Sequence, residues 1–135
     1  MAQTNASTRV KSRQYMTKEG EVLPAHPQWH ESNGTYSTED ARFLPPGREL
    51  ITGRAGVQAF WQSGFDQGAC DVVLESLEIK SLADGVAYEI GRNIVRLQTT
   101  DGSHIDVLGK SLCIFRRESD GFWRADVDMF NAINS

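Results

Sequence analysis

The 135-residue sequence is poor in the residue types that mark specialised classes of protein. It holds only two cysteines, Cys70 and Cys113, which form no CxxC pair and are typical of buried small side chains in a reducing compartment. Its three histidines, His26, His30 and His104, have no ligand spacing among themselves. We therefore predict that the protein holds no structural metal.

Long apolar runs and a surplus of positive charge are also missing. No stretch approaches the ~20 apolar residues that span a bilayer, and the first residues, MAQTNASTRVKSRQ, lack the apolar core of a secretory signal. Acidic and basic side chains are interspersed and the net charge is −4, so no basic patch marks a nucleic-acid surface. We predict a cytoplasmic protein of one domain that binds neither membranes nor nucleic acids.

Residues 1–35 form a poorly patterned N-terminal segment. A thin series of apolar residues runs through it until Pro24 and Pro27 interrupt it, and Asn33-Gly34 is typical of a turn. A helix over about residues 8–20 is one interpretation of this series. We therefore expect residues 36–135 to form the folded domain.

The clearest helical pattern lies between Thr52 and Gly68. The residues at helical spacing share one face, and they are Val57, Phe60, Trp61, Gly64 and Phe65. The Thr52 hydroxyl is suited to accept a free backbone N–H of the first turn, and Gly68 is suited to end the helix. Ahead of the helix, Pro45, Pro46 and Gly47 form a stiff corner.

Three Asp-Gly pairs divide the second half of the chain into four runs that are rich in β-branched and aromatic residues. The pairs are Asp84-Gly85, Asp101-Gly102 and Asp120-Gly121. Asp-Gly favours tight hairpin turns because glycine adopts a positive φ without steric cost. We predict an antiparallel meander over residues 70–131 and, with helical material before it, an α+β domain.

Several short segments of the sequence, in their order and spacing, resemble the SnoaL-like group. They are YSTEDARFLPPG, ITGRAGVQAFWQ, AYEIGR, DVLGK and GFWRADVDMFN. The group lies within the superfamily of ketosteroid isomerase and nuclear transport factor 2. The resemblance implies a cone-like domain over residues 36–135, in which a curved antiparallel or mixed sheet wraps around N-terminal helices. It also implies a cavity at the wide end of the cone, and dimers are common in such families.

The sequence departs from the ketosteroid isomerases at the corner. Those enzymes place a carboxylate base directly before a Pro-x-Gly, whereas this chain has Phe43-Leu44-Pro45 at that place. They also take a tyrosine acid from a helix ahead of the corner, and residues 1–35 show no regular amphipathic pattern. We therefore interpret LPPG as a corner that shapes the chain, and we do not carry the isomerase mechanism over.

Strand alternation singles out Glu89 as a candidate for a carboxyl inside the cavity. One face of its strand holds Ala87, Glu89, Gly91, Asn93 and Val95, and the other holds Tyr88, Ile90, Arg92 and Ile94. We favour the first face as inward because its glycine lets a helix or ligand approach closely. Burial would raise the pKa of Glu89 and suit it to general acid–base chemistry. The alternative is a structural ion pair with Arg92 or Arg124.

The other polar candidates flank the corner or lie in the last strand. Asp128 matches an acidic position in the group's D-x-aromatic-N ending, and the resemblance puts it at the pocket mouth with Phe130 and Asn131. Tyr36 is a candidate for polarising a substrate oxygen, and Asp40 for facing the ligand. The alternative for the two aspartates is to bind or cap local backbone groups, and for Tyr36 it is to fill the core.

Two functions from different classes remain open. The first is cofactor-independent acid–base catalysis, of isomerase, cyclase or hydrolase type, on a small apolar or aromatic molecule, with Glu89 or Asp128 transferring the proton. Trp61 and Phe65 would then contact the ligand, unless they only fill the core. The second is a non-catalytic module of the same fold for ligand binding or association. The apolar outer face of the meander predicts a homodimer in either case.

Overall fold

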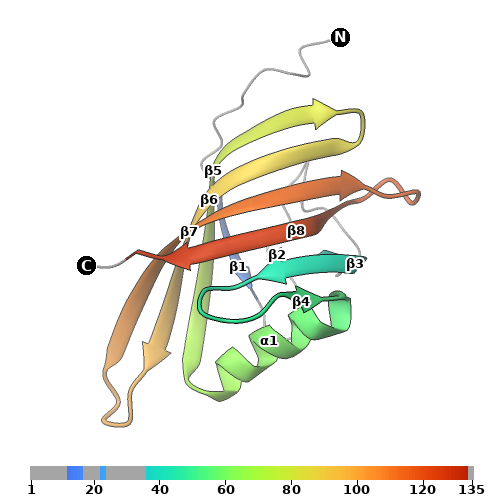
Figure 1. Ribbon diagram of the computed structural model, residues 1–135. Coiled ribbons are helices and arrows are strands. Elements are labelled where there is room, and N and C mark those ends of the chain that lie inside the picture. The colour runs from blue at the N-terminus through green and yellow to red at the C-terminus, as the bar shows by residue number, and fades with distance from the viewer. Residues whose placement is uncertain (1–11, 17–21, 24–35, 134–135) are drawn as a thin grey trace.

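The computed structural model describes residues 12–16, 22–23 and 36–133, which form one helix and eight strands within these ranges (Figure 1). The elements are β1 (Ser12–Met16), β2 (Val22–Leu23), β3 (Ser37–Leu44), β4 (Ile51–Thr52), α1 (Arg54–Asp66), β5 (Ala69–Ala83), β6 (Val86–Gln98), β7 (His104–Arg117) and β8 (Trp123–Ala132).

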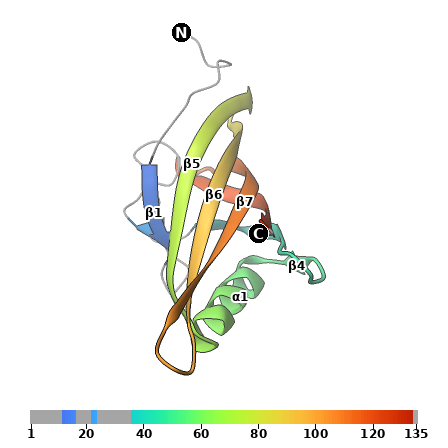
Figure 2. The same cartoon turned by 90° about the vertical axis from the view of Figure 1, so that its left-hand side faces the viewer.

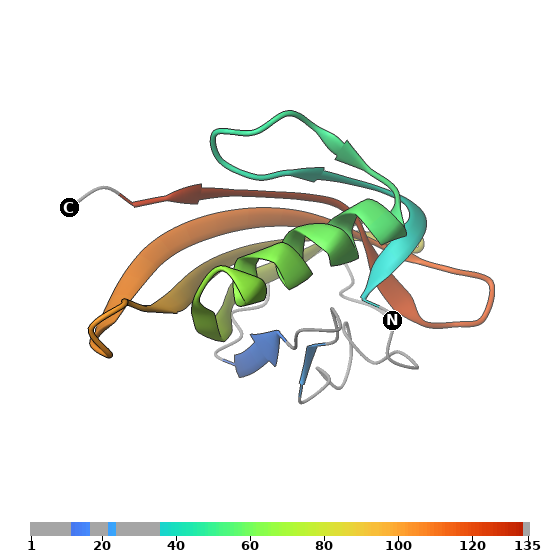
Figure 3. The same cartoon turned by 90° about the horizontal axis from the view of Figure 1, so that it is seen from below.

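The strands form one mixed sheet in the order β2-β1-β5-β6-β7-β8-β3-β4. All neighbouring pairs are antiparallel except β3 and β8, which run parallel. The long strands bend together, and α1 runs along the inside of the curve (Figures 2 and 3). The expected α+β fold, a curved mixed sheet around helical structure, is therefore confirmed, with α1 as the helix that the described residues contain.

The meander of β5 to β8 forms where the Asp-Gly pairs predict it. Its three turns place Gly85, Gly102 and Gly121 at φ values of 75°, 89° and 88°. Side chains with a Cβ adopt this left-handed region only with strain, so glycine at these points makes the hairpins easy to close. The antiparallel sheet predicted over residues 70–131 is confirmed.

The start of α1 differs from the expectation that Thr52 caps it. The helix begins at Arg54, its N-cap is Gly53 at φ 92°, and no side chain bonds the cap. Thr52 instead pairs with Arg42 as part of β4, which holds its backbone extended. Gly53 then turns the chain into the helix while its own N–H donates to the Ala41 carbonyl at 2.7 Å. Because Thr52 pairs within the sheet, it does not cap the helix, although its side chain is suited to do so.

The LPPG corner joins β3 to the short return strand β4. β3 ends at Leu44, Gly47 takes a φ of 70°, and the chain comes back so that Phe43 pairs with Ile51. The prolines remove donors and fix φ while the glycine supplies the positive φ. The corner ends one strand and aims the chain at α1, as the sequence predicted.

The N-terminal segment contains a strand where a helix over about residues 8–20 was one interpretation. β1 occupies Ser12–Met16 and pairs antiparallel with β5, with Gln14 opposite Leu74. The helix is therefore wrong for the described part of that range, because the exposed edge of β5 offers backbone partners that favour an extended chain. The turn expected at Asn33-Gly34 lies outside the described residues.

The core lies between α1 and the concave face of the sheet. Val57 of the helix is buried with Ala41 and Phe43 of β3, and the partly buried Phe60 and Trp61 pack against this cluster. The helical face predicted from the spacing of apolar residues is therefore the face that packs. Its burial fixes α1 across one end of the concave surface and leaves the middle of that surface to polar residues.

Candidate functional site

A row of directly opposed residues crosses the concave face through five neighbouring strands. Its members, from β5 through β6, β7 and β8 to β3, are Ile79, Glu89, Cys113, Asp128 and Phe43. Opposed side chains on one face of a sheet have Cβ atoms about 5 Å apart. Glu89 and Asp128 therefore face the same space on either side of Cys113, with the fully buried Ile79 and Phe43 closing the two ends of the row.

The predicted inward face of β6 is confirmed by its burial. Glu89 and Asn93 are 8% and 6% exposed, whereas Ile90 on the alternate face is 40% exposed. Gly91 lies between the two buried polar residues, and a Cβ there would meet the Glu75 carbonyl oxygen and the Ser111 hydroxyl, both at 3.0 Å. The expectation was that this glycine admits a helix or a ligand, but the groups that approach it closely are the β5 backbone and the Ser111 side chain.

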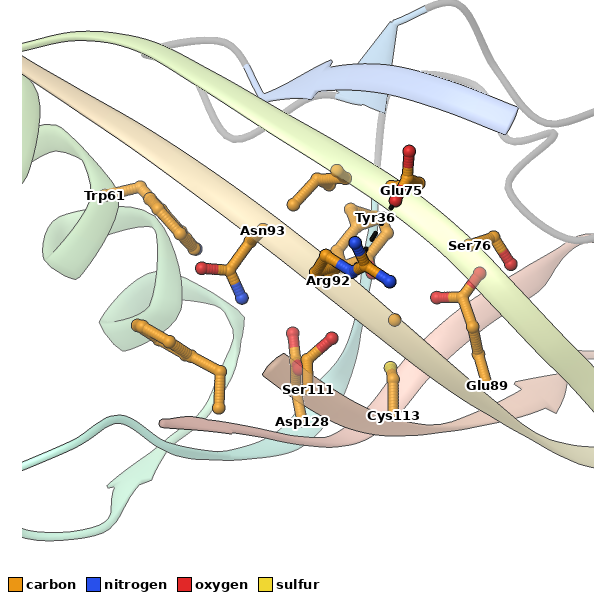
Figure 4. A pocket seen from close by; sticks show the side chains of 13 residues that line it. Tyr36, Trp61, Glu75, Ser76, Glu89, Arg92, Asn93, Ser111, Cys113 and Asp128 are labelled. Carbon is orange, nitrogen blue, oxygen red and sulfur yellow. Dashed lines mark ion pairs between the residues drawn. The ribbon is translucent and has the colours of Figure 1, made fainter. Parts of the chain in front are cut away.

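A pocket opens over this row (Figure 4). The residues that line it are Tyr36, Trp61, Leu74, Glu75, Ser76, Glu89, Gly91, Arg92, Asn93, Ser111, Cys113, Asp128 and Phe130. About 500 Å³ between them is free of atoms when the open mouth is included, but the centre of a water molecule fits in only about 30 Å³ of it. The pocket is therefore a narrow slot that suits a small or flat group.

One wall of the pocket is aromatic. The Trp61 ring, from α1, stacks on the Phe130 ring of β8 at 6.1 Å between centroids and 18° between planes. Phe130 in turn stacks on the buried Phe43 at 5.7 Å. The stack holds these rings against the slot and supplies an apolar surface next to its acidic row.

Both carboxyls of the row have raised pKa values. Desolvation by burial is the largest cause for Glu89, whose pKa rises from 4.5 to about 7. The side-chain hydrogen bond with Ser76 lowers this pKa, and the nearby charge of Asp128 raises it. Burial likewise raises the pKa of Asp128 from 3.8 to about 7. Each group therefore holds its proton close to neutral pH, where a carboxyl is able both to give and to take one.

Two weaker acids, Tyr36 and Cys113, lie beside the carboxyls. Burial raises the pKa of the Tyr36 phenol well above 10, and Cys113, Asp128 and Glu89 add to this rise. Burial also raises the pKa of the Cys113 thiol well above 9. Both groups therefore stay protonated around neutral pH, and their side chains form a hydrogen bond with each other. The Tyr36 ring is held edge-on against Phe115, with centroids 5.9 Å apart.

The arginines proposed as alternative partners of Glu89 make ion pairs elsewhere. Arg92 lies 3.7 Å from Glu75, and the side chains of this pair are 56% and 30% exposed. The buried Arg124 contacts Glu118 and Asp120, each at 2.9 Å. Both arginines therefore have carboxylate partners other than Glu89, and a structural ion pair of Glu89 stays an alternative.

The structure brings some predicted site residues to the pocket and leaves others outside it. Glu89, Asp128, Tyr36, Trp61 and Phe130 line the slot.

Asp40 lies on the exposed side of β3, and Asn131 is exposed near the end of β8. Phe65 packs in the cluster around Val72 and is not among the residues that line the slot. A role for these three in contacting a ligand remains a prediction.

Sequence reasoning missed Ser76, Ser111 and the inward place of Cys113 in the site. Ser111 and Cys113 lie two residues apart in β7, so their side chains share one face of the strand. The sequence does not show whether that face points toward the cavity or toward solvent. Ser76 precedes an irregularity in the β5–β6 pairing, where the register shifts between Ser76 and Glu78. Such a shift leaves no local pattern that the sequence displays.

The described ranges contain no group of three or more His, Cys, Asp or Glu side chains that could hold a metal ion. Within the same ranges, no helix has the length and apolarity that crossing a bilayer needs.

No protein-family model and no curated protein matches the sequence significantly. Solved structures do match. A ketosteroid isomerase-like protein from Erwinia carotovora atroseptica has a TM-score of 0.65 and 20% identity, covering 75% of this chain and 78% of that one. A putative calcium/calmodulin-dependent protein kinase II association domain from Xanthomonas campestris has a TM-score of 0.61 and 17% identity, covering 73% of this chain and 70% of that one.

A nuclear transport factor 2-like superfamily protein from Salmonella enterica is also similar, with a TM-score of 0.59 and 13% identity over 74% of this chain and 72% of that chain. At these identities the likenesses show the fold. The chain has the nuclear transport factor 2-like fold, which confirms the architecture that the sequence resemblance implied.

Proposed function

We propose that the slot binds a small apolar or aromatic molecule and that Glu89 or Asp128 transfers a proton on it without a cofactor. The observation that supports this most is the row across β6, β7 and β8, which puts two carboxyls at one pocket beside an aromatic wall. A carboxyl that titrates near neutral pH is matched to general acid–base catalysis.

The roles follow from the protonation states. The carboxyl that is ionised takes a proton from the ligand, and the other, still protonated, gives one back at a second atom. The Tyr36 hydroxyl stays protonated and donates a hydrogen bond to an oxygen on which negative charge develops. Trp61 and Phe130 hold the apolar body of the ligand in position.

The second candidate function is a non-catalytic module that binds a ligand or associates with a partner. The narrow space favours it, because only about 30 Å³ accepts the centre of a water molecule and a larger substrate would have to displace side chains. The likeness to a chain described as a putative association domain points the same way, at the level of fold.

A homodimer through the convex face is part of the proposal. Four apolar side chains oppose one another across β6, β7, β8 and β3 on that face, and these are Ile90, Leu112, Met129 and Leu44. They are 37–40% exposed. A continuous apolar row on a broad sheet is suited to packing against a second copy of itself.

A cytoplasmic location is also proposed. Its support is that Cys70 and Cys113 are both free thiols, one exposed and one buried. An exposed free thiol persists most readily in a reducing compartment.

Hydrogen exchange on small aryl ketones tests the catalytic proposal. The protein is incubated in D₂O with a panel of such ketones, binding is followed by ligand-observed NMR, and deuterium uptake at the carbon next to the carbonyl reports proton transfer. Wild type should bind at least one ketone and speed its exchange above the buffer rate. Glu89→Gln or Asp128→Asn should abolish exchange while binding persists, because each keeps the shape and removes the titration.

The control is Glu49→Gln, the same change at an exposed carboxyl, which should leave exchange unaltered. Binding without exchange in wild type, unchanged in both pocket variants, would establish the non-catalytic module instead. A panel in which nothing binds would contradict proton transfer on neutral aryl ketones in this pocket.

A further inference from the structure

The charged groups around the slot are mostly acidic. Of the described residues that line it, Arg92 is the only basic one, and it is more than half exposed and next to Glu75. Glu89 and Asp128 face the interior, where their neighbours from the start of β3 and from β7 are the neutral Tyr36 and Cys113. Ionisation of either carboxyl therefore adds negative charge to the slot.

A buried hydroxyl lies beside the Glu89 carboxyl in the slot (Figure 4). Ser76 is 3% exposed, and its side-chain hydrogen bond to Glu89 lowers the pKa of that carboxyl, against the larger effect of burial. A serine hydroxyl that donates to a carboxylate still has oxygen lone pairs that are able to accept from a guest. Ser76 and Glu89 together offer acceptors at one end of the slot.

The aromatic wall lies next to the two carboxyls. Trp61 and Phe130 line the same pocket as Glu89 and Asp128, and their rings are stacked with 18° between their planes. A ligand that joins a positively charged group to an apolar body therefore has carboxyls for the first and aromatic rings for the second.

The available space fits a small head group. About 30 Å³ accommodates the centre of a water molecule, and an ammonium group is of similar size. A primary ammonium carries three N–H donors and no acceptor. Those donors match the Glu89 and Asp128 carboxylates and the Ser76 hydroxyl, which come from three different strands.

We propose that the ligand of this pocket carries a protonated amine, with its ammonium group against Glu89 and Asp128 and its apolar body against Trp61 and Phe130. This inference rests on the proposed function, because it names the class of molecule that the same slot binds. A neutral alcohol satisfies Ser76 but gains nothing from the carboxylates, and an organic anion is repelled by them.

Proton linkage distinguishes an amine from a neutral ligand. The ammonium group favours the ionised carboxyls, so binding releases protons and tightens as pH rises through about 7. A neutral ligand that accepts a hydrogen bond from a protonated carboxyl binds more weakly over the same range. Tyr36 and Cys113 stay neutral throughout this pH range, so they do not contribute to the pH dependence of binding. The other charged groups at the slot are Glu75 and Arg92.

Calorimetry with three matched probes tests the proposal on the full chain: benzylamine, benzyl alcohol and benzoate. Benzylamine should bind roughly tenfold or more tightly than benzyl alcohol at about pH 8, and benzoate should not bind. The affinity for benzylamine should rise at least about tenfold from about pH 6 to about pH 8, since each carboxyl with a pKa near 7 changes from mostly protonated to mostly ionised.

Variants locate the effect. Glu89→Gln and Asp128→Asn should each weaken benzylamine binding and flatten its pH dependence, and Ser76→Ala should weaken it without flattening it. Glu49→Gln, at an exposed carboxyl, should change neither. The carboxyl carbons of wild-type protein, followed by ¹³C NMR, give a check that needs no variant, because benzylamine should move the titrations of both carboxyls to lower pH.

The failures are distinguishable. If benzyl alcohol binds as tightly as benzylamine, the amine is wrong while ligand binding in the slot stands. If no probe binds, the ligand site itself is contradicted along with the amine. If Glu49→Gln weakens benzylamine as much as the pocket variants do, the attraction comes from the surface charge and the proposal is overturned.

Discussion

Replacing Glu89 by glutamine should remove a pH dependence of stability that has a calculable size. An unfolded glutamate titrates near about pH 4.3, and burial raises the pKa of Glu89 in the folded chain to about 7. Between these values the folded protein retains a proton that the unfolded chain has lost. The free energy of unfolding therefore falls as pH rises through this window, and it levels off above the folded pKa.

The magnitude follows from the shift. One pKa unit corresponds to about 1.4 kcal/mol, so a shift of two to three units makes wild type about 3 to 4 kcal/mol less stable above the window than below it. Glu89→Gln keeps the shape of the side chain and does not titrate. The stability of this variant relative to wild type should therefore improve by about 3 to 4 kcal/mol between about pH 4 and about pH 8.

Urea unfolding followed by tryptophan fluorescence at several pH values measures this difference at constant protein concentration. Glu49→Gln, at an exposed carboxyl, supplies the baseline for the same chemical change. Asp128→Asn should behave like Glu89→Gln, and the double variant should show less than the sum because the charge of Asp128 contributes to the raised pKa of Glu89. A relative stability that stays constant across the pH range would refute the buried, proton-holding Glu89.

Three further changes test the fold and its surfaces. Trp61→Ala removes a ring stacked on Phe130 and should lower the free energy of unfolding in urea by about 3 kcal/mol, whereas a loss under about 1 kcal/mol would mean that the aromatic wall is not packed. Gly102→Val meets no neighbouring atom but has to adopt a φ of 89°, so it should cost at least about 1 kcal/mol, and a neutral result would contradict the turn. Leu112→Glu puts charge into the convex apolar row and should convert a dimer to a monomer by light scattering, while a wild type that is already monomeric at high micromolar concentration would exclude the interface.

Local signals in the sequence determined much of the meander. The Asp-Gly pairs located three turns because the conformation of a tight turn depends on its own residues, glycine above all. The period of two along β6 placed Glu89 and Asn93 on one side and Ile90 on the other, because alternation is a property of the extended backbone itself. The spacing of Val57 and Trp61 likewise defined a helical face, since the period of a helix is equally local.

Tertiary pairing decided what local preferences left open or favoured wrongly. Thr52 is a good capping residue, but its pairing with Arg42 in β4 moved the start of the helix to Arg54. The N-terminal apolar series gave a strand at Ser12–Met16 because β5 has an edge to pair with. In both places hydrogen bonds to a distant strand outweigh a local propensity of about 1 kcal/mol.

The site itself depends on register. Periodicity in the sequence says which residues share a face of one strand, but only the alignment of β6, β7 and β8 puts Glu89, Cys113 and Asp128 in one row. A shift of one residue in either pairing would turn one carboxyl away from the other, since neighbouring residues point to opposite faces. Burial between the helix and the sheet then raises both pKa values, and burial is a property of the packed molecule that no single stretch of sequence contains.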